Sequence, residues 1–421
     1  MIFAPKKDRT LSKIIVTLLV IGVGVVGALR AWSWFFQTYR TASSNGADAG
    51  DLNAVRNLVA QGQAEEARRL LQPVVATGKD SARTPQALML LAGIEQQAGN
   101  AEEARRLLER GYREFPASPE HPRLAVAYGR VLEAAGNADE AVRIYQEVQN
   151  SAPPELRAPA ITGLGRNAER NKDEFKARDL YRQALAEAPW DGEDWNEALD
   201  AIGRLNVALI FSPQENPESK RYTVQKGDSI TSIGNALNTT QGLLMRANGI
   251  DENTTLNLGQ QLKYTPKEFR IVIERSRRRL FLLDKDGIFK RYPVGLGKPG
   301  HETTLGSYKI GNKEKNPVWH KPGAGAIPAG DPANELGTRW MPLAPDQEGL
   351  PKDLGIHGTI HPETVGQYFS NGCPRLFRED VEELYDLVVR STPVDIVERL
   401  AAEDLRTVTN AERNSVAQQR S

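Results

Sequence analysis

Cysteine is almost absent from this chain of 421 residues, because Cys373 is the only one. A single thiol excludes an intramolecular disulfide and any metal site built from several cysteines. The chain also has no excess of charge of either sign, since 54 Lys and Arg residues balance 54 Asp and Glu residues. This balance argues against a chain built around a large basic surface for nucleic acid. With 40% hydrophobic and 26% charged residues the composition is that of a globular protein, and the length suggests several domains.

Long hydrophobic runs are missing too, with one exception near the N-terminus. Residues 14–29 are uncharged and mostly apolar, basic residues precede them, and an aromatic cluster ends at Phe36. Extended to Phe36, this run is long enough to cross a membrane, with its positive flank in the cytoplasm. A cleaved signal peptide is the alternative, but the aromatic cluster continues past any such cleavage site. We therefore expect residues 1–40 to form a cytoplasmic N-terminus and a single-pass anchor in the cytoplasmic membrane, with the body on the periplasmic side.

An internal repeat follows a small, polar linker at residues 41–51. Three similar phrases begin at Gly62, Gly99 and Gly136, each 37 residues after the one before, and a degenerate fourth copy begins at Lys172. Self-similarity at this period predicts stacked pairs of helices. In each copy a glycine ends one helix, an alanine marks a close helix crossing, and an apolar residue three positions later shares its face. The alanines are Ala67, Ala104, Ala141 and Ala177, and the apolar residues are Leu70, Leu107, Ile144 and Leu180.

The repeat resembles the tetratricopeptide repeat, with three residues more than the usual period of about 34. The resemblance covers residues 52–210 and implies an α-helical array. Such an array either holds a protein partner or serves only as a spacer, and the sequence leaves both open.

A second module occupies residues 221–265. Alternation at Tyr222–Val224 predicts a strand, Asp228 or Ser229 caps a first helix, a second helix covers about 240–247, and residues 261–264 predict a returning strand. This β-α-α-β order and the phrases YTV, GD, AN and GQQL resemble the LysM domain. The resemblance implies binding of glycan that contains N-acetylglucosamine, chiefly peptidoglycan, so that the module tethers the chain to the cell wall. A folded spacer without a ligand is the alternative.

Residues 268–398 are β-rich, with short strands, long loops and one helical pattern at 379–389. The candidate catalytic residues lie near the end of this segment, where Cys373 follows His357 by sixteen residues. An imidazole next to a thiol lowers its pKa and turns it into a thiolate nucleophile. Gly372 lets successive backbone N–H groups converge on one point, which is the geometry that holds a tetrahedral oxyanion. A cysteine and a histidine alone would be weak support for catalysis, since either is often a structural residue.

The motif around these two residues is more specific. His357-Gly358-Thr359 and the stretch from Ser370 to Leu376, SNGCPRL, resemble the signature of the L,D-transpeptidases of the YkuD family. Segments at 292–295, 303–306 and 327–340 also match the family's pattern. Asn371 stands where the family often has His, Thr304 replaces the proline of a T-P-x-G turn, and Pro374 stands where an aliphatic residue is common.

The resemblance implies a role for each residue of the motif. Cys373 is the nucleophile, His357 the general base, and the backbone carbonyl of Gly358 orients the imidazole. The N–H groups of Asn371, Gly372 and Cys373 form the oxyanion hole. Ser370 and Arg375 shape the pocket, and Arg375 pairs with a substrate carboxylate or is structural. We expect His361 to face solvent and His320 to lie in a loop, and a role of that loop in covering the site is disfavoured. Zinc held by His301, His320, His357 and His361 is disfavoured, because no pair of them has helical spacing on an expected helix.

Together these segments predict a multidomain protein with a transmembrane helix, a helical repeat array, a small LysM module and a β-rich L,D-transpeptidase catalytic domain, followed by a tail at 399–421. The implied reaction is attack of the thiolate on a tetrapeptide stem of peptidoglycan, release of D-alanine and transfer of the acyl group to an amine. Water or a protein lysine are alternative acceptors, and neither a metal nor another cofactor is required. The competing class is a non-catalytic scaffold that binds peptidoglycan.

Overall fold

The computed structural model describes residues 50–78, 80–321, 323 and 325–400. The expected membrane segment at 14–29, almost all of the linker and most of the C-terminal tail lie outside these residues. In the part that is described, no helix is both long enough and apolar enough to cross a membrane. The chain divides into two compact units, Met1–Ala198 and Leu199–Ser421.

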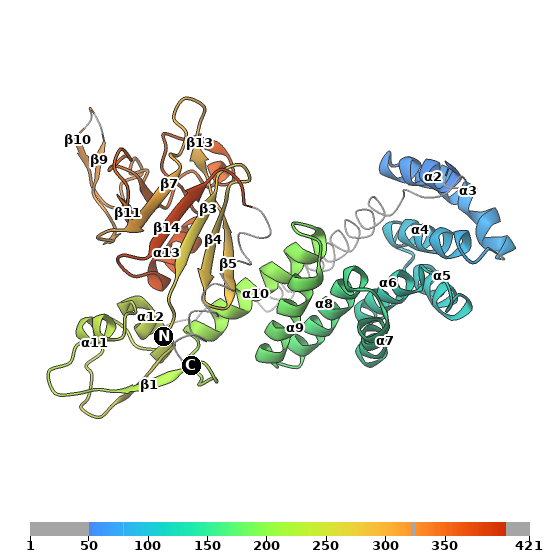
Figure 1. Ribbon diagram of the computed structural model, residues 1–421, viewed down its shortest axis with the longest axis horizontal. Coiled ribbons are helices and arrows are strands. Elements are labelled where there is room, and N and C mark those ends of the chain that lie inside the picture. The colour runs from blue at the N-terminus through green and yellow to red at the C-terminus, as the bar shows by residue number, and fades with distance from the viewer. Residues whose placement is uncertain (1–49, 79, 322, 324, 401–421) are drawn as a thin grey trace, which may run out of the picture. The chain divides into compact units, whose positions relative to one another are not determined.

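The first unit is a succession of antiparallel helices that stack in pairs (Figure 1). This arrangement confirms the helical array that the repeats predict. The helices are α2 (Gly50–Ala60), α3 (Ala64–Thr77), α4 (Arg83–Gln97), α5 (Ala101–Glu114), α6 (His121–Ala134), α7 (Ala138–Ser151), α8 (Pro154–Arg170), α9 (Glu174–Glu187) and α10 (Glu193–Phe211), of which the last runs on into the second unit.

The turn inside each repeat requires a left-handed backbone. Gly62, Gly99 and Gly136 have φ of 77°, 83° and 84° and follow the ends of α2, α4 and α6. A residue with a side chain adopts this conformation only at a cost, which accounts for glycine at the start of each phrase. In the degenerate fourth copy Lys172 takes the same place with φ of 60°. The fourth copy therefore keeps the turn geometry without the glycine.

The prediction of the core of the array is confirmed only in part, because Leu107 and Ile144 are buried, with 7% and 4% exposed, whereas the corresponding residues of the first and fourth copies are not. All four repeat alanines are at most 1% exposed, as the close crossings require, but Leu70 is 42% exposed and Leu180 is only partly buried. The fully buried partners lie four residues after the alanines, because a step of four is nearer to a full helical turn than a step of three. They are Leu71, Leu108, Tyr145 and Tyr181. Tyr145 fills the space between Gly129 of α6 and Gly163 of α8, where any Cβ would meet its ring at 2.6 or 2.3 Å.

The LysM module has the expected β-α-α-β order. Its elements are β1 (Lys220–Thr223), α11 (Ile230–Ala236), α12 (Gln241–Asn248) and β2 (Gln261–Tyr264), and β1 and β2 pair antiparallel. Ser229 caps α11 through a capping box with Ser232, and Thr240 caps α12. Val224, Ile233, Leu244 and Leu262 form the small core of the module.

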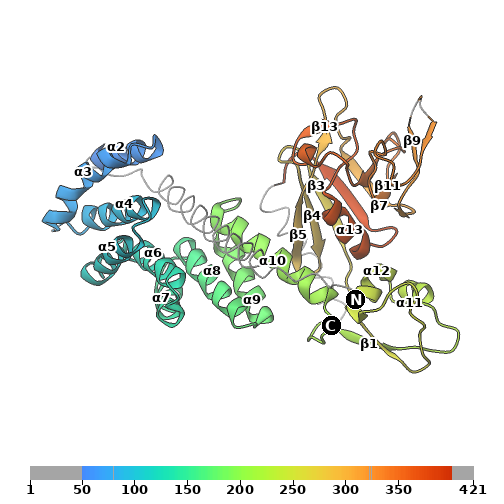
Figure 2. The ribbon, with the colours of Figure 1, turned by 180° about the vertical axis from the view of Figure 1, so that it is seen from behind.

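The remaining residues form a β-rich domain around an eight-stranded sheet, which Figure 2 shows from behind. The order along the sheet is β12-β11-β7-β14-β3-β4-β5, with β8 paired to β11. The strands are β3 (Arg270–Glu274), β4 (Arg279–Asp284), β5 (Gly287–Pro293), β6 (Leu296–Gly297), β7 (Gly306–Ile310), β8 (Glu314–Lys315), β9 (Trp319–Lys321), β10 (Gly325–Ile327), β11 (Arg339–Pro345), β12 (Gly355–His357), β13 (Tyr368–Ser370) and β14 (Pro393–Val397). Helix α13 (Arg378–Leu387) packs its apolar face against the core of this domain.

The core of the β-rich domain extends beyond its own residues. Leu243 of α12 is 3% exposed and belongs to this core, together with Ile210 and Phe211 from the end of α10. The amine of Lys263 in β2 donates to the backbone carbonyls of Leu209 and Ser212. The LysM module is therefore packed against the β-rich domain and does not hang from it on a free linker.

Candidate active site

His357 is the last residue of β12 and is 3% exposed. Its Nδ1 lies 2.6 Å from the carbonyl oxygen of Gly358. A carbonyl only accepts hydrogen bonds, so Nδ1 carries a proton and the lone pair of the neutral ring is on Nε2. Trp340 of β11, which pairs with His357 across the strands, lies with its ring centroid 5.7 Å from the imidazole. The ring is thus fixed in position and in tautomer.

The environment of His357 keeps the imidazole neutral. Burial lowers the pKa of His357 to about 3, and the positive charge of Arg375 acts in the same direction. Backbone carbonyls of Gly358, Glu335 and Leu336 oppose this effect only in part. At neutral pH the imidazole is therefore a proton acceptor and not an imidazolium.

The segment that carries Cys373 runs beside His357. The backbone N–H of His357 donates to the carbonyl of Pro374 at 3.1 Å, and that of Leu376 donates to the carbonyl of His357 at 2.9 Å. On its other side, Arg375 exchanges two backbone hydrogen bonds of 2.8 Å with Gly295. These bonds place the residues directly after Cys373 beside His357.

The thiol of Cys373 is protonated in this geometry, contrary to the expectation of a lowered pKa. Burial raises the pKa of Cys373, and the negative charge of Asp353 adds to that effect. The backbone N–H of Gly355 and the charge of Arg375 lower it by less. The Sγ lies 3.9 Å from the carbonyl oxygen of Asp353, a weak acceptor for the S–H proton. The expectation was wrong because burial, the largest influence on the pKa of this thiol, disfavours the charged thiolate.

The three backbone N–H groups assigned to an oxyanion hole are not equivalent. That of Gly372 donates to the hydroxyl of Ser370 at 3.1 Å and is already engaged. Within the described residues, those of Asn371 and Cys373 have no hydrogen-bond partner. Gly372 between them adopts φ of 127°, which only glycine reaches without strain. Two donors therefore remain available to an oxyanion.

Thr303 holds this turn in place, a role that the sequence did not suggest. Its side chain is fully buried, its hydroxyl donates to the carbonyl of Gly372 at 2.7 Å, and it accepts from the N–H of Gly297 at 3.0 Å. Thr303 lies in a segment that matches the family pattern, which was the available signal. Its hydroxyl joins β6 to the turn before Cys373.

Arg375 is 6% exposed and already paired. Its Nη2 lies 2.9 Å from a carboxylate oxygen of Glu335, a partner that the sequence did not suggest. A substrate carboxylate would have to displace Glu335 to reach this guanidinium. The structural interpretation of Arg375 is therefore the better supported of the two alternatives.

Among the other histidines, the backbone carbonyl oxygen of His301 lies next to the site, 3.8 Å from the position of a Cβ on Gly372, whereas His361 and His320 form no hydrogen bond, ion pair or ring contact with Cys373 or His357 in the described part of the chain. His361 is exposed, as expected, and precedes a short 3-10 helix at Pro362–Thr364. His320 lies on β9, in the β9–β10 hairpin and not in a loop, because the exposed polar segment pairs with residues 325–327. Over the described residues there is no group of three or more His, Cys, Asp or Glu side chains arranged to hold a metal ion.

Three segments of the chain match known domain families. Residues 268–396 match the family described as the L,D-transpeptidase catalytic domain, YkuD. Residues 222–265 match the LysM domain, and residues 52–119 and 95–160 match two tetratricopeptide repeat families.

Curated relatives are similar to part of the chain. The putative L,D-transpeptidase YkuD of Bacillus licheniformis is 29% identical over 181 residues, which is 42% of this chain and 97% of that protein. The putative L,D-transpeptidase YqjB of Bacillus subtilis is 34% identical over 131 residues, which is 30% of this chain and 70% of that protein. The probable L,D-transpeptidase YbiS of Escherichia coli K12 is 30% identical over 177 residues, which is 37% of this chain and 55% of that protein.

Solved structures are more distant. An L,D-transpeptidase from Mycobacterium tuberculosis H37Rv is 18% identical with a TM-score of 0.26, covering 34% of this chain and 64% of that one. The structure of Bdellovibrio bacteriovorus Bd1075 is 17% identical with a TM-score of 0.27, and the match covers 36% of this chain and 56% of that one.

Proposed function

Because the chain belongs to the L,D-transpeptidase family, we propose that Cys373 is the nucleophile of an acyl transfer on peptidoglycan stems and that His357 is its base. The chain is an enzyme of this family that acts on the cell wall, outside the cytoplasm. One observation carries the assignment. A buried, neutral imidazole, oriented by the Gly358 carbonyl, lies on a strand that is hydrogen-bonded to the segment directly after the only cysteine.

The first half of the reaction forms a thioester. Nε2 of His357 takes the thiol proton of Cys373 as Sγ attacks the carbonyl of the third residue of a tetrapeptide stem. The N–H groups of Asn371 and Cys373 hold the oxyanion. As the tetrahedral intermediate collapses, the imidazolium returns its proton to the amine of the departing D-alanine. The bond between the third residue and D-alanine breaks, and a carbon–sulfur bond replaces it.

In the second half an acceptor resolves the thioester. His357 accepts a proton from the amine of a neighbouring stem, the amine attacks the thioester, and Sγ leaves and regains its proton. The product is a 3-3 cross-link. Water as acceptor would give carboxypeptidase or endopeptidase activity, and a protein lysine would give attachment of a protein. Incubation with disaccharide-tetrapeptide distinguishes these routes, because mass spectrometry separates dimer from hydrolysed monomer.

We assign supporting roles to the other modules. The LysM module binds glycan that contains N-acetylglucosamine, and the helical array holds a protein partner. Since the chain belongs to an enzyme family, the non-catalytic scaffold is not retained as an alternative.

The catalytic assignment is tested by acylation with a carbapenem, the β-lactam class to which this family is susceptible. Intact-mass spectrometry should show one adduct on Cys373, absent in Cys373→Ala and slower by orders of magnitude in His357→Ala. Asn371→Ala should change the rate far less, because the proposed donor at that position is the backbone N–H. A folded protein that forms no adduct, and whose thiol reacts with iodoacetamide only after denaturation, would contradict the proposal.

A further inference from the structure

A groove of about 660 Å³ lies between the LysM module and the catalytic domain. One wall consists of α11, α12 and the loop Ile250–Asn253, and the other of residues from β8, β11 and the end of α13. Neither Cys373 nor His357 lines it, and its volume falls within the range of about 300–1,000 Å³ that is usual for ligand sites. The groove is therefore separate from the candidate active site and large enough for a ligand.

Specific contacts between the two modules fix the width of the groove. A Cβ on Gly242 of α12 would lie 2.2 Å from a carboxylate oxygen of Asp386 on α13, so only glycine allows this approach. Arg246 pairs with the same carboxylate at 3.3 Å, and Lys315 of β8 pairs with Glu252 at 2.6 Å. With Leu243 in the catalytic core, these contacts set the walls without any ligand present.

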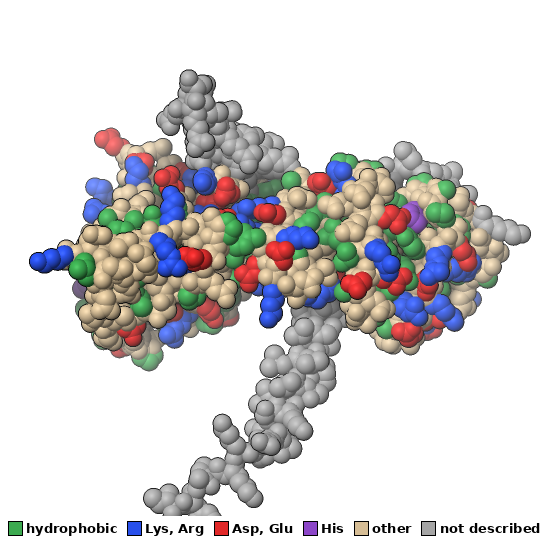
Figure 3. All heavy atoms as spheres, turned by 90° about the horizontal axis from the view of Figure 1, so that it is seen from below, with side chains coloured by type: hydrophobic (Ala, Val, Ile, Leu, Met, Phe, Trp, Pro, Cys, Tyr) green, Lys and Arg blue, Asp and Glu red, His purple; other side chains and the backbone are tan. Residues whose placement is uncertain are grey.

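The groove carries more positive than negative side chains. Five cationic side chains line it, against three carboxylates, so its formal net charge is +2. The cations are Arg246, Lys313, Lys315, Arg339 and Arg390, and the carboxylates are Asp251, Glu252 and Asp386. This local excess contrasts with the whole chain, in which positive and negative charges balance, and with the face that Figure 3 shows, where they lie interspersed.

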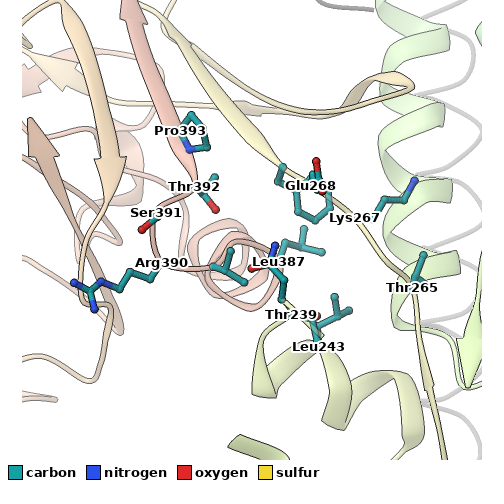
Figure 4. Close-up of a pocket in the computed structure, with 13 residues that line it drawn as sticks. Thr239, Leu243, Thr265, Lys267, Glu268, Leu387, Arg390, Ser391, Thr392 and Pro393 are labelled. Carbon is teal, nitrogen blue, oxygen red and sulfur yellow. The ribbon is translucent and has the colours of Figure 1, made fainter. Parts of the chain in front are cut away.

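The five cations differ in whether they already bind another group of the chain. Lys313 donates to the carbonyls of Tyr385 and Val388 at 2.6 Å each, so it serves the end of α13. Arg390 is exposed and forms no ion pair within the described part of the chain. It also lines a smaller cavity of about 210 Å³ beside the groove, and in Figure 4 its guanidinium extends away from the other residues of that cavity. Arg390 is thus the cation that a ligand reaches without breaking a pair.

Neutral polar groups complete the LysM wall. Hydroxyl and amide side chains line it, and such groups recognise sugar hydroxyls and acetamido groups through hydrogen bonds. They are Thr231, Asn235, Gln241 and Asn253. Amide and hydroxyl donors on one wall, with an unpaired guanidinium on the other, suit a ligand that is both saccharide and carboxylate.

We propose that this groove binds an acidic glycan segment, an amino-sugar chain that carries peptides with free carboxylates, and that the segment spans from the LysM wall to the catalytic domain. The inference rests on the proposed action on peptidoglycan. It adds a site at which both modules hold one ligand, away from Cys373. The carboxylates contact Arg390, and the sugar hydroxyls contact the α11 and loop side chains.

The test measures binding to two probes with the full chain carrying Cys373→Ala. The acidic probe is a peptidoglycan tetrasaccharide with two tripeptide stems, and the neutral probe is the tetramer of N-acetylglucosamine. Arg390→Glu should weaken binding of the acidic probe by about tenfold at low ionic strength, and Asn253→Asp on the opposite wall by about threefold. Lys285→Glu, the same charge change in the exposed β4–β5 turn, should leave the affinity within about twofold.

The outcomes separate the groove from the catalytic proposal. Unchanged affinity for the acidic probe in both groove variants would overturn the proposed binding site. An equal loss of affinity for the neutral probe would also overturn it. The proposed function is measured independently by carbapenem acylation of chains that retain Cys373, and Arg390→Glu should be acylated at the parent rate. If the parent is not acylated while Arg390→Glu still loses the acidic probe, the catalytic proposal fails and the groove stands.

Discussion

His357 makes the catalytic unit sensitive to acid, because its imidazole is buried in the neutral form. Its pKa is about 3 in the folded chain and about 6.5 when unfolded, so the unfolded state binds the proton more readily between these values. The stability associated with the neutral ring is complete above about pH 6.5 and is lost as the pH falls towards 3. For one such group, the free energy of unfolding changes by at most about 1.4 kcal/mol per pH unit.

His357→Gln should therefore flatten the pH dependence of the urea midpoint between pH 6.5 and pH 4. His361→Gln, which changes an exposed histidine next to the site, is the matched control and should keep the parent slope. An identical slope in His357→Gln and the parent would show that the imidazole is not buried as described.

Thr303 offers a second test at the scale of a single residue. Thr303→Val keeps the shape of the side chain but removes both hydrogen bonds that hold the turn before Cys373. The loss of buried partners should cost about 1–3 kcal/mol, and the misplaced turn should slow carbapenem acylation by about tenfold. Thr304→Val alters an exposed neighbour and should change neither. An acylation rate equal to that of the parent would remove Thr303 as a positioning residue.

The sequence indicated the two residues that we propose carry the chemistry but not their ionisation. Cys373 and His357 were identified because their motif is local and specific. The raised pKa of the thiol depends on burial and on the charge of Asp353, neither of which the motif encodes. Glu335 and Thr303 approach the site from loops distant in sequence, and only the fold brings them there.

At the scale of the element, the repeat period predicted the helices and their turns. It did not predict the rotation of each helix about its axis, which decides which of two adjacent residues faces the core. The glycines and alanines were correctly placed because turns and close crossings accept few residue types. Leu70 was misplaced because two adjacent leucines satisfy the pattern equally well, and only packing shows that Leu71 is buried.

The turn between α8 and α9 provides a stability prediction for the array. Lys172→Gly should stabilise the array by about 0.5–1 kcal/mol, since glycine adopts the left-handed conformation without the penalty that lysine incurs. The reverse change, Gly136→Lys, should destabilise it by about 1 kcal/mol through the backbone alone, because nothing lies within 4 Å of a Cβ there. Urea unfolding followed by circular dichroism measures both, and a loss of stability in Lys172→Gly would contradict the common turn geometry.

At the scale of the whole molecule, the LysM module is built into the catalytic unit. The sequence suggested a tether, because a LysM motif does not indicate whether the module packs against a neighbouring domain. Leu243 of α12 lies in the catalytic core, whereas its neighbour Leu244 lies in the core of the LysM module. The two leucines therefore report on different cores from adjacent positions.

Leu243→Ala should destabilise the catalytic domain by about 2–5 kcal/mol, as expected for a large core side chain. Leu244→Ala should have its main effect on the LysM module. Hydrogen exchange resolves the two, because Leu243→Ala should speed exchange in β3 and β4 and Leu244→Ala in β1 and β2. Unchanged exchange of β3 and β4 in Leu243→Ala would indicate a module that is merely tethered.

The protonated thiol of Cys373 has a consequence for the lifetime of the enzyme. Outside the cytoplasm no glutathione pool repairs thiols, and oxidants attack the thiolate far faster than the thiol. A nucleophile that is ionised at rest would be exposed to irreversible oxidation between encounters with substrate. In the proposed mechanism the proton stays on sulfur until His357 takes it as the substrate carbonyl is attacked, and no second cysteine in the chain can trap the sulfur as a disulfide. The same burial that makes the resting site slow to react therefore protects it from chemical damage while it waits.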